Sequence, residues 1–424
     1  MTVSERLAEF ASGPLELPHD VSQMAKEIIA NALALALASW EVEPASIAFG
    51  IVESFRTPEQ ATVWGRNVRV GVGWAALVNG IAVHFEDYDD THMRTLLHPG
   101  PVIVPAALAM FEYCNASSRV LLEGVVLGTE IAMRIGNGIS PAHYERGWHV
   151  TSTMGRIGAS IAAARIAGLS AEQMRNSIAI AALETGGVTA ALGTMTKPFH
   201  PGKAAFDGIE AVLLAQYGVA GAAEAIEGES GLAALMSDHV DIDVILDGLG
   251  ERWEILTNSF KPYSCGLVSH PIIDAAIELR GRVAPEEIAS IDVTAHPLVL
   301  DLMGKRDPQN GLESKFSAHH CAAIGFLYGE GGPKQFSDAC AREATVRELR
   351  DKVTIEPSDG VAVGGVRMSV RDRNGRTEHA EVLHATGSIE NPMSPAQLST
   401  KAKALLGERF EQLRQQLSSY GIST

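Results

Sequence analysis

The stretch TMGRIGASIAAARIAGL, residues 153–169, decides how this chain folds. Alanine, isoleucine and leucine allow a helix, and the many small side chains let a neighbouring helix approach closely. The segment is apolar on almost every face, which is typical of a helix in the interior of a bundle. Gly168 follows the last full turn and is a common helix terminator. The stretch therefore predicts a central, buried helix.

Similar alanine- and leucine-rich segments occur throughout the first 260 residues. Ser170 is a good capping residue for one of them, and Pro18 stands just before another. The segments lie at residues 21–40, 119–135, 170–184 and 204–220. Together they predict a large all-helical domain over residues 1–264.

The pattern changes after about residue 265, where β-branched residues begin to alternate with polar ones. The Asn374-Gly375 dipeptide is typical of a type I′ hairpin turn between two strands. Because helical segments intervene, residues 265–391 are expected to form a smaller α+β lid domain. The strand patterns lie at residues 288–298, 352–357 and 364–385.

The tail at residues 394–417 is expected to form one amphipathic helix, with Ser394 and Pro395 as its start signal. It would return to the first domain. The predicted fold class is therefore mainly α: a large all-helical domain with residues 392–424 packed back on it, and a smaller α+β lid domain.

The composition restricts the classes of partner. Of 424 residues, 46% are hydrophobic and 20% charged, which is typical of a globular protein. A formal net charge of −17 argues against a nucleic-acid partner or an anionic membrane. The apolar stretch at residues 30–40 is short for a membrane span and is expected to be a buried helix.

The four cysteines are Cys114, Cys265, Cys321 and Cys340, and no two of them form a CxxC pair. Disulfides and a thiolate zinc site are therefore disfavoured, and the N-terminus lacks the pattern of a secretory signal. We expect a cytoplasmic protein.

The stretch HFEDYDDTHMRTLLHPG, residues 84–100, concentrates three histidines and four acidic residues. These residue types suit a divalent metal. They also suit an acid/base site, because neighbouring carboxylates raise each other's pKa. A third interpretation is a solvated helix end. Spacing alone leaves all three open.

Four further clusters contain residues suited to chemistry. Lys197 lies in a turn before a helix, where the amide groups favour anions. Lys261 precedes a proline near the expected domain junction, and ligand sites favour such junctions. Ser317 and the His319-His320 pair begin an apolar helix, and His149 begins another. No GxGxxG, GxxxxGK[ST] or GxSxG motif is present, which disfavours a nucleotide cofactor and a serine-hydrolase triad.

These clusters resemble the MmgE/PrpD family, which includes 2-methylcitrate dehydratases, cis-aconitate decarboxylases and an iminodisuccinate epimerase. The resemblance covers nearly the whole chain. It implies a helical domain with a lid, a homodimer, and chemistry without a bound cofactor or metal. It is carried, in order, by HFEDYDDTH…HPG, GWHVTSTMG, MTKPFHPGKAAFDG, SFKPYSCGLVSHP, LESKFSAHH and NPMSPAQL.

The resemblance also implies site residues and a substrate, a small di- or tricarboxylate. The preferred reaction is dehydration, with decarboxylation or epimerisation at the same site as alternatives. Lys197, Lys261 and a protonated His98 would hold carboxylates, and an acid/base pair would come from Asp87, His98 and His149. The implied catalytic residues are Asp87, Thr91, His98, His149 and His320, and the substrate-binding residues are Lys197, Lys261 and Ser317.

Two departures from the family pattern stand out: Gly100 replaces a common serine, and His320 replaces a tyrosine. Two other function classes remain open. One is a non-catalytic protein that binds carboxylates. The other is a metal-dependent hydrolase built from His84, Asp87, Asp89, Asp90, His92 and His98.

Overall fold

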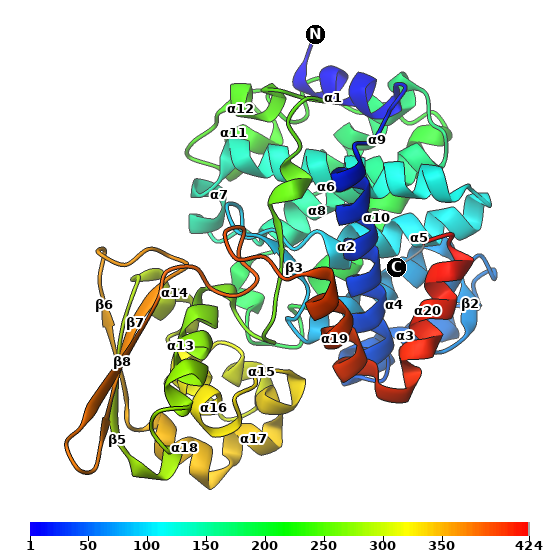
Figure 1. The fold of residues 1–424 in the computed structure, drawn as a ribbon. Coiled ribbons are helices and arrows are strands. Elements are labelled where there is room, and N and C mark those ends of the chain that lie inside the picture. Colours follow the sequence, from blue (N-terminus) through cyan, green and yellow to red (C-terminus); the bar gives the residue numbers. More distant parts are fainter. Residues whose placement is uncertain (423–424) are drawn as a thin grey trace.

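The computed structural model describes residues 1–422 and is mainly α-helical (Figure 1). The N-terminal part is a layered helical bundle that also contains two short strand pairs. Its helices are α1 (Val3–Ser12), α2 (His19–Ser39), α3 (Glu43–Ser54), α4 (Val72–Phe85), α5 (Gly100–Cys114), α6 (Ser118–Ile139), α7 (Ala142–Glu145), α8 (Val150–Ile166), α9 (Ala171–Leu183), α10 (Phe199–Gln216), α11 (Leu232–Met236) and α12 (Ile242–Leu246).

The second part combines helices with a four-stranded sheet of order β6-β5-β7-β8, in which only β5 and β6 are parallel. Figure 1 shows α13 and α16 between this sheet and the helical bundle. The elements are α13 (His270–Arg280), β5 (Ile288–Ala295), α14 (Leu298–Met303), α15 (Gly311–Ser314), α16 (Ala318–Tyr328), α17 (Asp338–Arg342), α18 (Ala344–Arg350), β6 (Val353–Pro357), β7 (Val366–Asp372) and β8 (Thr377–Val382).

Helix α8, which contains most of the opening stretch, lies at the centre of the bundle and packs against α5, α6, α9 and α10. Small residues explain the close contacts. A Cβ atom on Gly158 would lie 2.7 Å from the carbonyl oxygen of Gly128 on α6, and one on Gly155 would lie 2.8 Å from the Val102 side chain. The glycines therefore let helices approach to backbone contact, as the sequence predicts.

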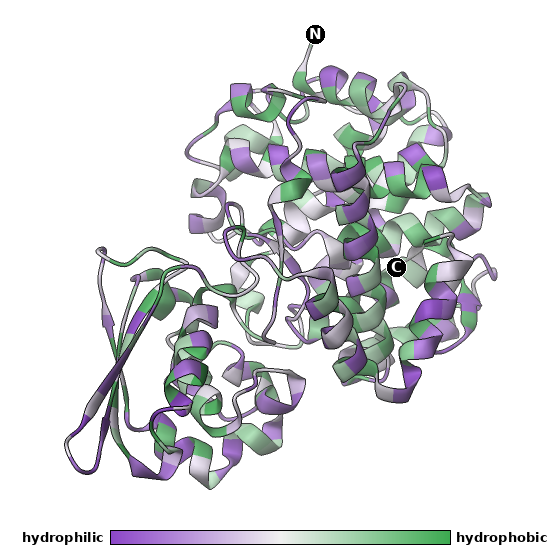
Figure 2. Ribbon diagram, viewed as in Figure 1, coloured by the Kyte–Doolittle hydropathy of each residue, from purple (hydrophilic) through white to green (hydrophobic). Residues whose placement is uncertain are grey.

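Two separate hydrophobic cores follow the two parts of the chain. One core runs from Val3 to Phe260 and includes residues 406–422, and the other runs from Cys265 to Ala380. Figure 2 shows hydrophobic residues along much of α2 and α4 inside the bundle. The domain boundaries at residues 264 and 392 stay a prediction that agrees with these cores.

The first part is not all-helical, contrary to the prediction. Strand β1 (Ala61–Val63) pairs with β2 (Val68–Val70), and β3 (Asp90–His92) pairs with the distant β4 (Asn258–Phe260). Three-residue strands are too short for their alternation to be visible in a sequence. The β3–β4 pair matters most, because it brings residues 87–92 beside Lys261.

Two local predictions, the single tail helix and the type I′ turn, are also wrong. The tail forms two helices, α19 (Pro395–Leu406) and α20 (Phe410–Ser419), because the chain reverses direction at Gly407 with a φ of 54°. Both helices pack on α2, beside which Figure 1 shows them. In the β7–β8 hairpin only Gly375 has a positive φ, whereas a type I′ turn requires one at Asn374 as well.

Helix α2 is longer than its apolar stretch suggested. With 21 residues it passes a length and composition test for a membrane span, but 61% of its most apolar window is buried inside the protein. Its buried face includes Ile28, Ile29 and Leu33 and packs against α4, α5 and α19. Burial in the bundle accounts for its apolar character.

Candidate active site

The loop after α4 brings together acidic residues and lysines that are distant in the sequence. Asp87 has a positive φ of 51°, a conformation that aspartate tolerates better than most residues. Strand β3 then pairs with β4, with Asp90 opposite Phe260, so that Lys261 emerges next to Asp87. Lys197 arrives from the turn before α10. Asp87 and Lys261, which this strand pairing brings together, are 174 positions apart in the sequence.

Asp87 lies between two buried ammonium groups. Its Oδ1 accepts a hydrogen bond from Lys197, and its Oδ2 lies 3.0 Å from Nζ of Lys261. Lys261 also donates to the Asp87 backbone carbonyl at 3.2 Å. Burial acts to raise the pKa of Asp87, but the charges of the two lysines outweigh it and hold this pKa well below its usual range. Asp87 is therefore an ionised partner of the two lysines in the free protein, which does not suit a general acid.

His98 has a defined tautomer. Its Nδ1 lies 3.1 Å from the Asp90 backbone carbonyl, which can only accept a hydrogen bond, and 3.0 Å from Oγ1 of Thr91. Nδ1 therefore carries the proton, and Nε2 forms no hydrogen bond with any residue from 1 to 422. Burial lowers the pKa of His98, so its ring is neutral near pH 7. The predicted role of a protonated His98 as a clamp does not fit the free protein.

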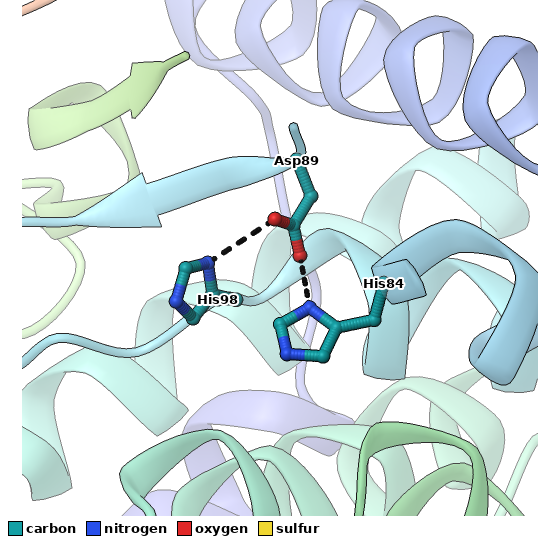
Figure 3. A group of neighbouring side chains, drawn as sticks. All are labelled: His84, Asp89 and His98. Atoms are coloured by element: carbon teal, nitrogen blue, oxygen red, sulfur yellow. Dashed lines mark hydrogen bonds and ion pairs between the residues drawn. The ribbon is translucent and has the colours of Figure 1, made fainter. Parts of the chain in front are cut away.

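Asp89 supports His98 from behind. Figure 3 shows the Asp89 carboxylate between the two rings. Its Oδ2 lies 2.5 Å from Nδ1 of His84, and its Oδ1 lies 3.4 Å from Nδ1 of His98. Burial acts to raise the pKa of Asp89, but the two histidines hold it well below its usual range. Burial lowers the pKa of His84 to about 4. An ionised carboxylate thus orients two neutral rings.

Of the six residues in the proposed metal set, the structure brings together three, His84, Asp89 and His98. Their ligand atoms lie within 4.8 Å of one another. The direct 2.5 Å contact uses the His84 and Asp89 atoms as hydrogen-bond partners. The other three candidates have separate partners. Asp87 faces lysines, Asp90 accepts from Asn258 at 3.1 Å, and His92 contacts Thr95. The six residues do not form one metal centre.

His149 precedes α8, and its ring lies 6.1 Å from the ring of His84. Its Nδ1 lies 2.9 Å from Nδ1 of His200 on α10. Burial and then the neighbouring charges of His84 and Lys197 place the pKa of His149 well below its usual range. His149 is therefore a second neutral imidazole beside the lysines.

A cavity of about 70 Å³ unites six of the predicted residues. Ligand pockets usually measure about 300–1,000 Å³, so the space in this conformation is small. No motif pointed to Tyr144, which also lines the cavity and whose pKa burial raises to about 12. The residues from the predicted set are Asp87, Thr91, His98, His149, Lys197 and Lys261.

Ser317 and His320 do not line the cavity, in contrast to their predicted roles. Oγ of Ser317 caps α16 by accepting from the backbone N–H of His320 at 3.1 Å. The ring of His320 donates from Nε2 to the Gln335 carbonyl at 2.7 Å and packs near Phe336. Both side chains are fully buried, Ser317 at the start of α16 and His320 beside Phe336.

Two lysines outside the predicted set, Lys315 and Lys401, bind backbone carbonyls of the loop that carries Asp87. Lys315 donates to the Glu86 backbone carbonyl at 2.6 Å and pairs with its carboxylate at 2.6 Å. Lys401 on α19 donates to the backbone carbonyls of Tyr88 at 2.6 Å and Lys261 at 3.0 Å. Burial lowers the pKa of Lys401 to about 7. Sequence reasoning missed Lys401 because nothing in the tail marks it as buried.

The side chain of Asp90 explains why residue 100 is a glycine. A Cβ atom on residue 100 would overlap Oδ1 of Asp90, and Oδ2 of Asp90 accepts from the Gly100 backbone N–H at 3.1 Å. Burial and then the charge of Asp89 raise the pKa of Asp90 to about 7. The missing side chain at residue 100 therefore makes room for a carboxylate at the start of α5.

The comparisons with known proteins agree with this geometry. The profile of the MmgE/PrpD N-terminal domain matches residues 5–245, and that of the MmgE/PrpD C-terminal domain matches residues 263–419. The chain belongs to the MmgE/PrpD family and is an enzyme. It is a lyase of that family and acts on a carboxylate.

Several relatives are named cis-aconitate decarboxylase. The Homo sapiens protein is 27% identical over 405 residues, covering 91% of this chain and 83% of its own length. The Mus musculus protein is 29% identical over 366 residues, covering 81% and 74%. The Aspergillus terreus protein is 24% identical over 433 residues, covering 94% and 88%.

Proposed function

We propose that this protein dehydrates a small 3-hydroxy di- or tricarboxylate without a bound cofactor. One observation carries the proposal: His98 has a fixed tautomer with its Nε2 free, in the same cavity as Lys197 and Lys261. A neutral imidazole with a free lone pair is a general base, and the ammonium groups are carboxylate partners. Removal of a proton next to a carboxylate needs both.

The lysines keep donors available for a substrate. An ammonium group has three N–H donors. Lys197 uses one on Asp87, and Lys261 uses two on the Asp87 carboxylate and carbonyl. The remaining donors can bind substrate carboxylates, while Asp87 keeps both side chains in place. Asp87 is thus a positioning residue in this mechanism.

The elimination follows from these positions. Nε2 of His98 takes the proton α to a carboxylate, and the electron pair of the broken C–H bond forms the double bond. The C–O bond to the 3-hydroxyl breaks, and the hydroxide leaves as water after taking a proton from His149. The lysines stabilise the negative charge that develops on the carboxylate. Thr91 contacts His98 and can hydrogen-bond the substrate.

A bound substrate should favour protonation of the histidines, because it adds negative charge to the cavity. Lys197 and Lys261 balance the ionised Asp87 and Asp89, so a bound polycarboxylate adds negative charge that the cavity does not compensate. Nearby negative charge raises a histidine pKa. His149 can therefore hold a proton for the leaving group in the complex, although burial keeps it neutral in the free protein.

Decarboxylation is the second candidate, and the names of the relatives favour it. A C–C bond would break to release CO₂, and the electron pair left on carbon would be delocalised toward a carboxylate held by the lysines. A histidine would then protonate the carbon. The same cavity residues serve this reaction, but it needs a proton donor rather than a base.

We further propose that residues 265–391 act as a lid. The cavity is too small for a tricarboxylate to enter without movement, and Gly266, Met303 and Phe316 close it from the second part of the chain. The Lys315–Glu86 pair joins this lid to the loop that carries Asp87. Opening must therefore break that ion pair.

The test is incubation with a panel of citrate-, malate- and aspartate-like acids in D₂O, followed by NMR. Alkene formation with loss of water supports dehydration, whereas release of CO₂ establishes the decarboxylase. Deuterium exchange without net reaction would instead identify an epimerase. Lys261→Met serves as the control, because it removes a carboxylate partner and should abolish any reaction that belongs to this cavity.

A further inference from the structure

The contact between His149 and His200 is not used by the mechanism above. Their Nδ1 atoms lie 2.9 Å apart, and the ring centroids are 5.1 Å apart. A hydrogen bond between two imidazole nitrogens requires one proton between them, because two lone pairs repel and two N–H groups collide. Either ring can be the donor, so two tautomeric arrangements satisfy the same contact.

The two rings differ in their surroundings. His149 is buried and lines the cavity, whereas His200 is only partly buried at the start of α10. Neither Nε2 atom has a hydrogen-bond partner within residues 1–422. The backbone N–H of His149 is fixed by the Gly187 carbonyl at 3.0 Å. The pair therefore connects the cavity with a less buried position.

We propose that His200 is a proton-relay residue that exchanges protons between His149 and solvent during turnover. The inference rests on the proposed function, in which His149 gives a proton to a leaving group or to carbon. After each turnover His149 must be reprotonated, and its side chain is buried, whereas His200 is partly exposed. His200 supplies a path through its Nδ1 contact.

The relay step conserves protons and charge. In the complex the pair carries one extra proton, so that His200 holds protons on both nitrogens and donates from Nδ1 to His149, whose own proton is on Nε2. As the Nε2 proton of His149 passes to the substrate, the Nδ1 proton of His200 moves to Nδ1 of His149, and neither ring becomes an anion. Both rings are then neutral, and the pair has lost one positive charge. The pair returns to its first tautomers, and a proton taken up from solvent at Nε2 of His200 restores the starting state.

The variant His200→Asn separates a relay from a structural contact. Asparagine can still donate a hydrogen bond to Nδ1 of His149, but it cannot pass a proton on. We expect kcat to fall about 10²-fold, the lower end of what a positioned proton-transfer group contributes, with KM almost unchanged. A His200→Asn variant with the kcat of the unsubstituted protein would overturn the proposal.

The second variant, His200→Ala, opens space for an external proton carrier. Added imidazole should restore part of kcat, and a series of substituted imidazoles should give a rate that depends on the pKa of each. His239→Ala, which changes a histidine in a loop away from the cavity, is the control for non-specific effects of imidazole. A slow His200→Asn variant together with a His200→Ala variant that no imidazole accelerates would mean a purely structural role.

A measurement that needs no turnover tests the relay independently of the proposed reaction. With ¹⁵N-labelled histidine, the Nδ1 resonances of His149 and His200 should both lie between the values for protonated and unprotonated nitrogen, and both should move when a polycarboxylate is added. One Nδ1 with a fixed proton in all states would refute the relay. An absence of turnover on every acid in the panel would refute only the proposed reaction.

Discussion

Residues 86–98 and residues 315–320 both combine histidines, hydroxyl groups and charged side chains, yet the fold uses them differently. In the first segment, Asp87, Thr91 and His98 line the cavity. In the second, Ser317 caps a helix and His320 satisfies a backbone carbonyl. Similar composition therefore does not give similar roles. The difference is whether distant lysines reach the segment.

The reason lies in the backbone around each segment. The backbone carbonyls of residues 86–88 accept hydrogen bonds from lysines, and the Asp87 side chain lines the cavity. Residues 315–320 begin a helix, and the first turn of a helix has unpaired N–H groups that consume nearby hydroxyls. Just before this turn, Lys315 pairs with Glu86 of the other segment and Phe316 lines the cavity.

The largest effect on the first segment is expected from Asp87→Asn. The substitution leaves Lys197 and Lys261 buried without their shared carboxylate, and breaking a buried ion pair costs about 3–5 kcal/mol. We expect turnover to be lost and the free energy of unfolding to fall, measured by urea denaturation. Asp238→Asn, which breaks the exposed pair with Arg146, is the control and should cost at most about 1 kcal/mol. Equal stability losses would contradict the assignment.

The next test compares the histidines of the two segments. His98→Gln should reduce kcat about 10²–10⁴-fold, because the positioned base is removed. His320→Gln should lower the melting temperature through its lost hydrogen bond to Gln335 but leave the kcat of the folded protein close to its original value. Steady-state kinetics on both variants decides this. A greater loss in His320→Gln would place that residue in the mechanism after all.

Acid should destabilise the folded protein. Burial lowers the pKa of His84, His143, His319 and His320 to about 4, whereas unfolded histidine titrates near 6.5. The unfolded chain therefore binds more protons than the folded one between these values, and the free energy of unfolding falls as pH falls from about 6.5 to about 4. Asp90 opposes this trend, because its raised pKa makes the fold lose stability as pH rises toward 7. Denaturation midpoints at several pH values check the sign; constant midpoints would be inconsistent with neutral buried histidines.

The smallest effect is expected from Lys315→Met, which removes the link between the segments. A hydrogen bond to a charged group contributes about 1.5–3 kcal/mol, so lid closure should weaken and KM should rise about tenfold or more. Lys305→Met is the control, since it removes a more exposed pair with Glu313 in the same part of the chain. If both variants have the same KM as the unsubstituted protein, the ion pair does not hold the lid.

Much of the fold could be predicted from residue patterns. The helices around residues 119–184 have caps and apolar faces that act locally, and Ser170 forms its predicted cap. The β3–β4 pair could not be predicted, because each strand has three residues and its partner lies far along the chain. The break at Gly407 was also missed, since a single glycine in an amphipathic stretch is compatible with a continuous helix.

The sequence by itself determined the family, the helical class and the residue types of the site. The reason is that each motif and each helix signal is contained in a short stretch of neighbouring residues. Only the tertiary structure decided which charges meet. It placed Lys197 and Lys261 on Asp87, Lys401 behind them, and His200 against His149. The physical reason is that pairing and burial depend on contacts between residues far apart in the chain, which local patterns do not encode.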